Sequence, residues 1–161
     1  MTASKLEIVA EPDKPTMETR YVVDAPRALV FEVHTKPQHL KNWWGPSAYE
    51  LAVCDIDLRV GGRYRFVERD RDGRTFAFIG EYREIVVPEK LVFTLAFEGM
   101  ADADALQTIR FEEHAGKTTI HSIAVYKSVA ARDGHIRNGM EGGMRESYDR
   151  MTALLAALPK T

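Results

Sequence analysis

The C-terminal segment has a different hydrophobic period from the rest of the chain, and this change is what most constrains the fold. Residues 49–126 mostly alternate between apolar and polar, which is typical of strands with one buried face. From residue 140 onward, large apolar side chains instead recur every three or four positions, as on one face of an α-helix. A strand-rich region followed by one long amphipathic helix predicts an α+β domain, with the helix lying across one face of an antiparallel sheet. The residues that define the helical face are Met140, Met144, Tyr148, Met151, Leu155 and Leu158.

Turn signals divide the alternating region into hairpins. Asp72-Gly73 is a strong two-residue turn signal, and residues 87–90 (VPEK) and 114–117 (HAGK) mark two further turns. The small, acidic segment at residues 99–104 is expected to be a loop. Together with a first strand at residues 17–24, these boundaries predict about six to seven antiparallel strands.

Two short helices are predicted between the first strand and the rest of the sheet. Asp24 is a candidate N-cap and Pro26 falls in the first turn, which favours a helix start. Pro37 interrupts this helix and can open the next one, which a Gly-Pro pair ends. Trp43 and Trp44 lie three and four residues after a leucine, so both indoles can face the same side.

Length and composition indicate one domain and argue against a membrane protein. A chain of 161 residues fits a single domain. Residues 1–16 are polar and contain two prolines, so we expect a flexible N-terminal tail and then one domain over residues 17–161. No apolar run approaches the ~20 residues of a membrane helix. The tail lacks the apolar core of a signal peptide, and a single cysteine excludes an internal disulfide. These observations predict a cytoplasmic protein without membrane insertion.

The sequence carries no signature of metal, cofactor or nucleic-acid chemistry. Its formal net charge is −2 and its lysines and arginines do not cluster, which argues against a nucleic-acid partner. The five histidines and one cysteine lack the spacing of metal ligands. Neither a phosphate-binding loop nor a nucleophile elbow is present. We therefore expect no metal site and no cofactor, and we assign no catalytic residue.

Four segments resemble the homologues of the activator of the ninety-kilodalton heat-shock chaperone ATPase. They read DAPRALVFEVHTKPQHLKNWWGP, DLRVGGRYRF, IGEYREIVVPEKLVFT and GMEGGMRESYDRMTALLA, and they span roughly residues 21–158. That family belongs to the START/Bet v 1-like (SRPBCC) superfamily. The resemblance implies a helix-grip fold, in which a curved antiparallel sheet surrounds a long C-terminal helix and a deep, mostly apolar cavity lies between them. Superfamily members include lipid carriers, hormone receptors and cyclases, so the fold alone does not name a function.

We expect the cavity wall to consist of aromatic side chains and methionines. Methionine adapts to irregular shapes, and a few polar groups in an apolar pocket fix the orientation of a ligand. The alternative is an ordinary filled core for the apolar residues and a solvated salt bridge for the charged ones. The expected ligand-binding residues are Trp43, Trp44, Tyr64, Phe66, Phe78, Tyr82, Phe93, Leu95, Phe97, Met140, Met144 and Tyr148, and the expected polar anchors are Arg59, Glu81 and His34.

Three functions are compatible with these residues. The first is non-catalytic binding of a small hydrophobic molecule, such as a lipid, polyketide or aromatic metabolite. The second is a cyclase- or aromatase-like enzyme that uses one buried acid or base, for which His34, Asp57, Glu81 and Tyr82 are candidates. The third is a chaperone-interacting module, which the resemblance suggests although the additional N-terminal domain of the eukaryotic activators is missing here. An exposed sheet edge is also compatible with a homodimer.

Overall fold

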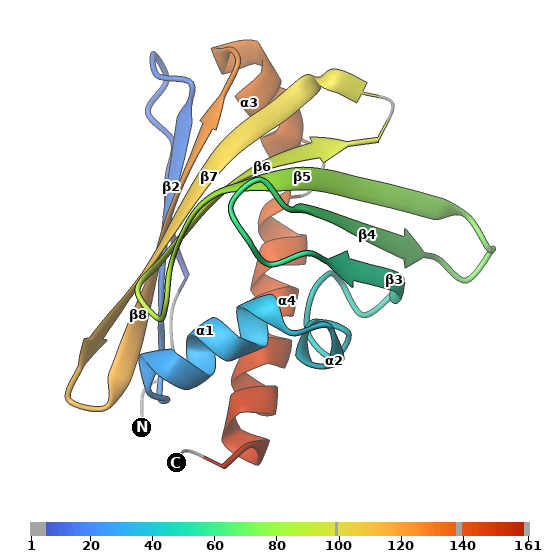
Figure 1. Ribbon diagram of the computed structural model, residues 1–161. Helices are drawn as coiled ribbons and strands as arrows, with labels where there is room; N and C mark the ends of the chain where they lie inside the picture. The colour runs from blue at the N-terminus through green and yellow to red at the C-terminus, as the bar shows by residue number, and fades with distance from the viewer. Residues whose placement is uncertain (1–5, 99, 138–139, 160–161) are drawn as a thin grey trace.

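An eight-stranded antiparallel sheet curves around the C-terminal helix (Figure 1). The computed structural model describes residues 6–98, 100–137 and 140–159, with the backbone alone for residues 100–103 and 140. The strand order is β1-β2-β8-β7-β6-β5-β4-β3. The strands are β1 (Glu7–Val9), β2 (Thr16–Val23), β3 (Glu50–Ile56), β4 (Arg63–Arg69), β5 (Thr75–Val86), β6 (Lys90–Phe97), β7 (Met100–His114) and β8 (Lys117–Tyr126). The helices are α1 (Arg27–Thr35), α2 (Pro37–Leu40), α3 (Val129–Arg137) and α4 (Met140–Ala157).

The α+β architecture expected from the change of hydrophobic period is confirmed, and α4 crosses the concave face of the sheet (Figure 1). Register shifts interrupt the pairing of β3 with β4, of β5 with β6 and of β6 with β7. Bulges of this kind bend the strands that contain them. On the inner face of α4, Met151 is fully buried and the ring of Tyr148 stacks 4.8 Å from that of Tyr21. Among the described helices, none combines the length and apolar character that a membrane crossing requires.

The sheet has eight strands rather than six to seven, and one strand lies where a tail was expected. Residues 7–9 form β1, whose Ile8 pairs with Thr19 of β2. Leu6 is 3% exposed, and Ile8 packs against the core. The expectation of a flexible segment over residues 1–16 therefore differs from the structure. Two apolar side chains among polar neighbours are enough to dock a three-residue strand, and such a strand is too short to show an alternating pattern.

Two further segments differ from the pattern in the sequence. Part of the acidic segment at residues 99–104 belongs to β7, whose first residue pairs with the end of β6. The pattern also does not predict α3, because this helix lacks an apolar face. Its Arg132 is 3% exposed, and its guanidinium donates hydrogen bonds to the carbonyl oxygens of Lys14 at 2.6 Å and Thr16 at 3.2 Å. Polar contacts with the backbone therefore hold α3 against β2.

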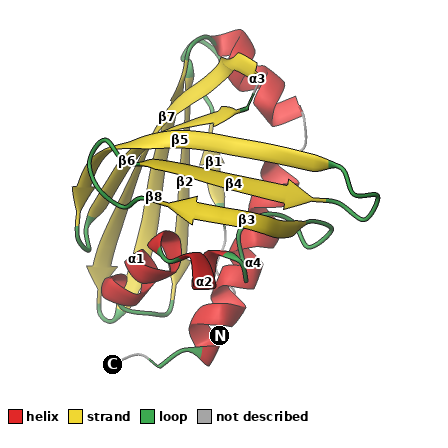
Figure 2. Ribbon diagram, turned by 45° about the vertical axis from the view of Figure 1, so that its right-hand side comes forward, coloured by secondary structure: helices red, strands yellow, loops and turns green. Residues whose placement is uncertain are grey.

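The pair α1–α2 spans the lower opening of the curved sheet, with α1 against β7 and β8 and α2 against β3 (Figure 2). Pro26 precedes α1, and the expected side-chain cap from Asp24 is not formed. Pro37 separates the two helices, because it has no N–H to donate to the carbonyl oxygen of Val33. The indole Nε1 of Trp43 donates to that oxygen instead, at 2.8 Å. This bond joins the turn after α2 to the end of α1.

Candidate functional site

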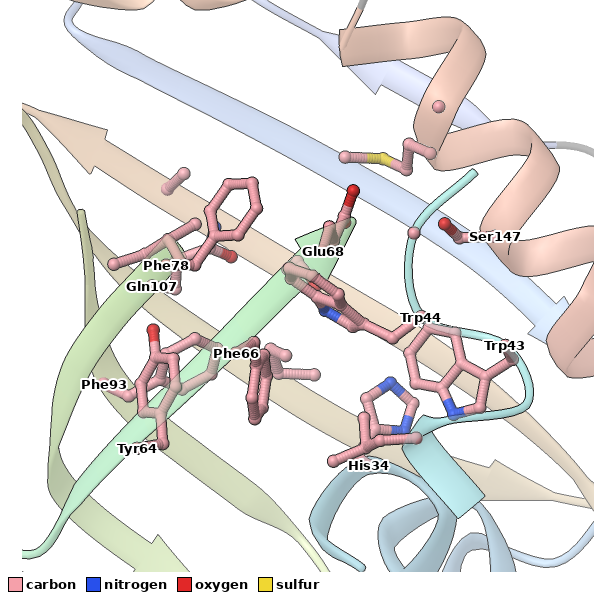
Figure 3. A pocket seen from close by; sticks show the side chains of 18 of the residues that line it. His34, Trp43, Trp44, Tyr64, Phe66, Glu68, Phe78, Phe93, Gln107 and Ser147 are labelled. Carbon is pink, nitrogen blue, oxygen red and sulfur yellow. The ribbon is translucent and has the colours of Figure 1, made fainter. Parts of the chain in front are cut away.

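A cavity of about 570 Å³ lies between the concave face of the sheet, the α1–α2 pair and α4 (Figure 3). Cavities of ~300–1,000 Å³ with mostly apolar walls are typical of small-molecule sites. Most of the residues expected to bind a ligand do line this cavity. They are His34, Trp43, Trp44, Tyr64, Phe66, Phe78, Tyr82, Phe93, Leu95, Phe97, Met144 and Tyr148. The side chain of Met140, also expected there, lies outside the described part of the chain.

Two expected polar anchors do not line the cavity. Arg59 lies in an exposed turn, and its Nε donates to Asp57 Oδ2 at 2.8 Å. Glu81 forms an ion pair with Arg83 at 3.3 Å. Glu81 is the neighbour of Tyr82 on β5, and successive side chains of a strand point to opposite faces. Because Tyr82 points into the cavity, Glu81 points away from it, so the alternative interpretation as solvated salt bridges describes both residues.

Aromatic rings from neighbouring strands form one wall of the cavity. The indole of Trp44 makes edge contacts with Phe66 and Phe78, with ring centroids 4.9 and 5.1 Å apart. Tyr64 lies 4.9 Å from Phe66, and its hydroxyl donates to the carbonyl oxygen of Thr94 at 2.6 Å. Burial raises the pKa of Tyr64, which keeps the hydroxyl protonated. Since that hydroxyl is already bonded, Tyr64 presents its apolar ring to the cavity.

A glycine in β5 makes room for this wall. A Cβ added at Gly80 would lie 1.9 Å from the carbonyl oxygen of Thr94 and 2.4 Å from Tyr64 Cε2. Neither contact can be relieved by a flexible side chain, since one atom is backbone and the other belongs to a packed ring. Only glycine therefore lets Tyr64 cross β5 and bond to β6.

His34 supplies a polar group on the α1 side of the cavity. Its Nδ1 lies 2.8 Å from the carbonyl oxygen of Val30, and a carbonyl oxygen only accepts, so Nδ1 carries the proton. The ring packs between Trp43 and Phe111, 4.9 and 5.0 Å from their centroids. Burial lowers the pKa of His34 to about 4, so the ring is neutral near pH 7. Its Nε2 is then an acceptor, and the hydrogen bond of this ring to a described residue is the one at Nδ1, so Nε2 is left to the cavity that His34 lines.

Glu68 is the principal residue of the cavity that the sequence interpretation missed. It lies on β4 and is 6% exposed. Burial raises its pKa to about 7, although the positive charge of Arg150 acts in the opposite direction. The alternation along β4 holds the signal that could have found it, because residues 64, 66 and 68 share one face of the strand. Glutamate is rarely buried without a partner. A glutamate is therefore usually expected on the outer face of a strand, although the alternation along β4 puts residue 68 on the inner face.

The backbone of Gly45 lies directly against the Glu68 carboxyl group. A Cβ added at Gly45 would lie 2.5 Å from Glu68 Oε1, and the φ angle of this glycine is +88°. The positive φ angle is what favours glycine here, whereas the short contact shows how closely the Glu68 carboxyl group approaches this backbone. Other polar residues that the sequence interpretation missed also line the cavity. They are Thr19, Gln107, Ser122, His135 and Ser147.

Metal binding and thiol chemistry find no support in the described residues. They contain no group of three or more His, Cys, Asp or Glu side chains arranged to hold a metal ion. Cys54 is buried, and burial raises the pKa of its thiol to about 11. The thiol is therefore protonated near neutral pH, whereas the thiolate is the reactive form.

Comparison with known proteins places this cavity in a recurring fold. A family model described as "Activator of Hsp90 ATPase homolog 1-like protein" matches residues 24–156. A crystal structure of a Rhodobacter sphaeroides protein superimposes with a TM-score of 0.86 at 23% identity, covering 95% of this chain and 99% of that chain. Protein Ms6760 from Mycobacterium smegmatis gives a TM-score of 0.86 at 23% identity, over 98% and 99% of the two chains.

A third similar structure is an AHSA1-like protein from Aeromonas hydrophila, with a TM-score of 0.70 at 18% identity over 86% of this chain and 94% of that one. At these identities the structures show the shared fold. No curated protein matches the chain. The comparisons therefore leave the contents of the cavity to be inferred from its own residues.

Proposed function

Because the chain belongs to the family of Activator of Hsp90 ATPase homolog 1-like proteins, we propose that it binds a small hydrophobic molecule in the cavity between the sheet and α4. The observation that carries this proposal is the size of the cavity, about 570 Å³, combined with its wall of aromatic rings. A filled core would leave no such volume, since protein interiors are close-packed. Lipids, polyketides and aromatic metabolites have the required shape and polarity.

A second candidate is an enzyme that acts on a hydrophobic substrate by acid–base chemistry. One observation favours it: Glu68 lines the cavity and its pKa is raised to about 7, close to the value that suits a general acid or base near neutral pH. Turnover would require a substrate proton within reach of this carboxyl group. Loss of turnover in Glu68→Gln with retained ligand affinity would distinguish the enzyme from the binding protein.

The third candidate, a chaperone-interacting module, is suggested by the family description. The cavity residues neither require nor exclude such a partner, because they face inward. A pull-down with the chaperone that recovers none of this protein would remove the candidate without affecting the other two.

Native mass spectrometry of freshly purified protein is the direct test of the proposed function. A retained apolar molecule would support it, and extraction would then give the chemical class of that molecule. A titration with a neutral apolar dye, N-phenyl-1-naphthylamine, measures the affinity of the cavity and allows wild type to be compared with the variants described next. The dye is chosen because it has no charge that could be attracted to Glu68.

Filling the cavity is expected to abolish dye binding. Gln107 lines the cavity and is half-buried, whereas its neighbour Leu106 on β7 points outward and is 41% exposed. Gln107→Trp adds a large ring inside the cavity, so dye affinity should fall by roughly tenfold or more. Leu106→Trp adds the same ring on the outer face and should leave affinity unchanged. Equal binding by both variants would place the dye elsewhere and count against the proposed function.

A further inference from the structure

The carboxyl group of Glu68 is buried in the cavity without a hydrogen-bond partner. The residue is 6% exposed and its carboxyl group faces the cavity, and within the described ranges no hydrogen bond or ion pair reaches either of its oxygen atoms. Figure 3 shows its oxygen pointing into the space between Phe78 and Ser147. A buried carboxylate without a partner is costly, and natural proteins usually pair such a group. The position is therefore that of a group whose partner arrives with a ligand.

The charged groups around Glu68 do not supply this partner. Arg150 of α4 acts on Glu68 at longer range, but its Nη1 donates to the carbonyl oxygen of Gly45 at 2.8 Å. No ion pair joins Arg150 to Glu68 among the pairs of the described side chains. Glu146, one turn earlier on α4, accepts hydrogen bonds from the backbone N–H and the hydroxyl of Ser47. Both α4 side chains are thus held by the segment 45–47.

Glu68 and His34 both present hydrogen-bond acceptors to the cavity. Ionised Glu68 offers two carboxylate oxygens, and neutral His34 offers Nε2, because Nδ1 is bonded to Val30. The aromatic rings beside them also favour a cation, whose charge is attracted to the face of an aromatic ring. The indole of Trp44, whose next residue Gly45 lies against the Glu68 carboxyl group, is one such ring in the cavity wall. A ligand that fits these groups carries donors and a positive charge.

We propose that Glu68 is a recognition group for a basic amine, and that the ligand is a hydrophobic molecule carrying one primary or secondary amino group. This inference rests on the proposed function, because it names the polar end of a ligand that the apolar cavity holds. The ammonium group donates to the Glu68 carboxylate, and the hydrophobic body packs against Phe66, Phe78 and the neighbouring rings. Charge-assisted hydrogen bonds of this kind are roughly twice as strong as neutral ones.

Two compounds with one skeleton test the inference. Calorimetric titration with 1-naphthylmethylamine and 1-naphthalenemethanol, at about pH 8 where Glu68 is ionised, compares an ammonium with a hydroxyl on the same ring. Wild-type protein should bind the amine at least about tenfold more tightly than the alcohol. Glu68→Gln should bind both compounds equally, with the affinity for the alcohol unchanged. Glu68→Met should give the same result, which covers the case in which one variant folds poorly.

A matched control separates recognition from a general charge effect. Glu81→Gln removes the same charge from the neighbouring strand, outside the cavity, and should keep the preference for the amine. Equal binding of amine and alcohol by wild-type protein would overturn the inference and leave the proposed function standing. Absence of binding by both compounds would also overturn it. If Gln107→Trp and wild type then take up the neutral dye equally, the proposed function falls as well.

Discussion

Replacing Trp43 by alanine is expected to lower the free energy of unfolding by about 4 kcal/mol, because large-to-small changes at buried aromatic positions cost ~3–5 kcal/mol. Trp43 is 4% exposed, and its ring packs against His34 and Tyr148. Its Nε1 also donates to the carbonyl oxygen of Val33, which Pro37 leaves without a donor. The substitution therefore creates a cavity and removes the bond that joins the turn after α2 to α1.

Urea denaturation of three variants separates these two effects. Trp43→Phe keeps most of the ring but lacks the N–H, so it should cost about 1–3 kcal/mol, the usual penalty for a buried polar group left unpaired. Trp44→Phe is the matched control, since this neighbouring indole is half-buried and donates no hydrogen bond to a described residue. It should cost less than Trp43→Phe. Equal losses in the two phenylalanine variants would mean that the indole bond contributes nothing to stability.

Replacing Glu68 by glutamine is expected to stabilise the protein at about pH 8 by up to about 3 kcal/mol, and to have little effect at about pH 4. Burial raises the pKa of Glu68 from its ordinary value of 4.5 to about 7. Below pH 4.5 the carboxyl group is protonated in the folded and unfolded states alike. As the pH rises from 4.5 to about 7, the unfolded state releases its proton first, so wild-type stability falls. Well above pH 7, Glu68 is ionised in both states and causes no further fall in the free energy of unfolding.

The difference between variant and wild type isolates this group. His34 changes the free energy of unfolding with pH in the opposite direction. Burial lowers its pKa from 6.5 to about 4, so the stability that depends on its neutral ring is lost as the pH falls through that range. A wild-type profile alone therefore mixes the two groups, whereas Glu68→Gln minus wild type, measured in urea at several pH values, reports Glu68. A flat difference for Glu68→Gln would mean that the carboxyl group is well solvated in the folded state.

The sequence predicts the architecture well because the architecture depends on hydrophobic period. The alternation along β4 places Tyr64 and Phe66 on the concave face, and the helical period places Met144 and Tyr148 opposite them. A prediction goes wrong where the polar character of a residue is given more weight than its place in the alternation of the strand. Glu68 shares the inward parity of its strand, yet it is absent from the predicted site because glutamate is seldom buried.

Other features depend on contacts that no local pattern contains. The strand β1 is three residues long, and its docking depends on Leu6 reaching a core built from distant segments. Similarly, α3 has no apolar face, and its buried Arg132 bonds to backbone carbonyl groups more than a hundred residues away in sequence. Only the folded chain brings these partners together, so neither the spacing nor the composition of the segments reveals them.

The strand order also has a kinetic consequence. Among the strand pairs that the structure describes, all join neighbours in sequence except β2 with β8, which pairs Thr16 with Val125 and Val23 with Thr118. Closing so long a loop costs entropy before any contact offsets it, and topologies with distant pairings fold slowly. The hairpins from β3 to β8 can form early, whereas the β2–β8 ladder must wait. During synthesis, the ribosome must therefore translate most of the chain before the ligand cavity can form.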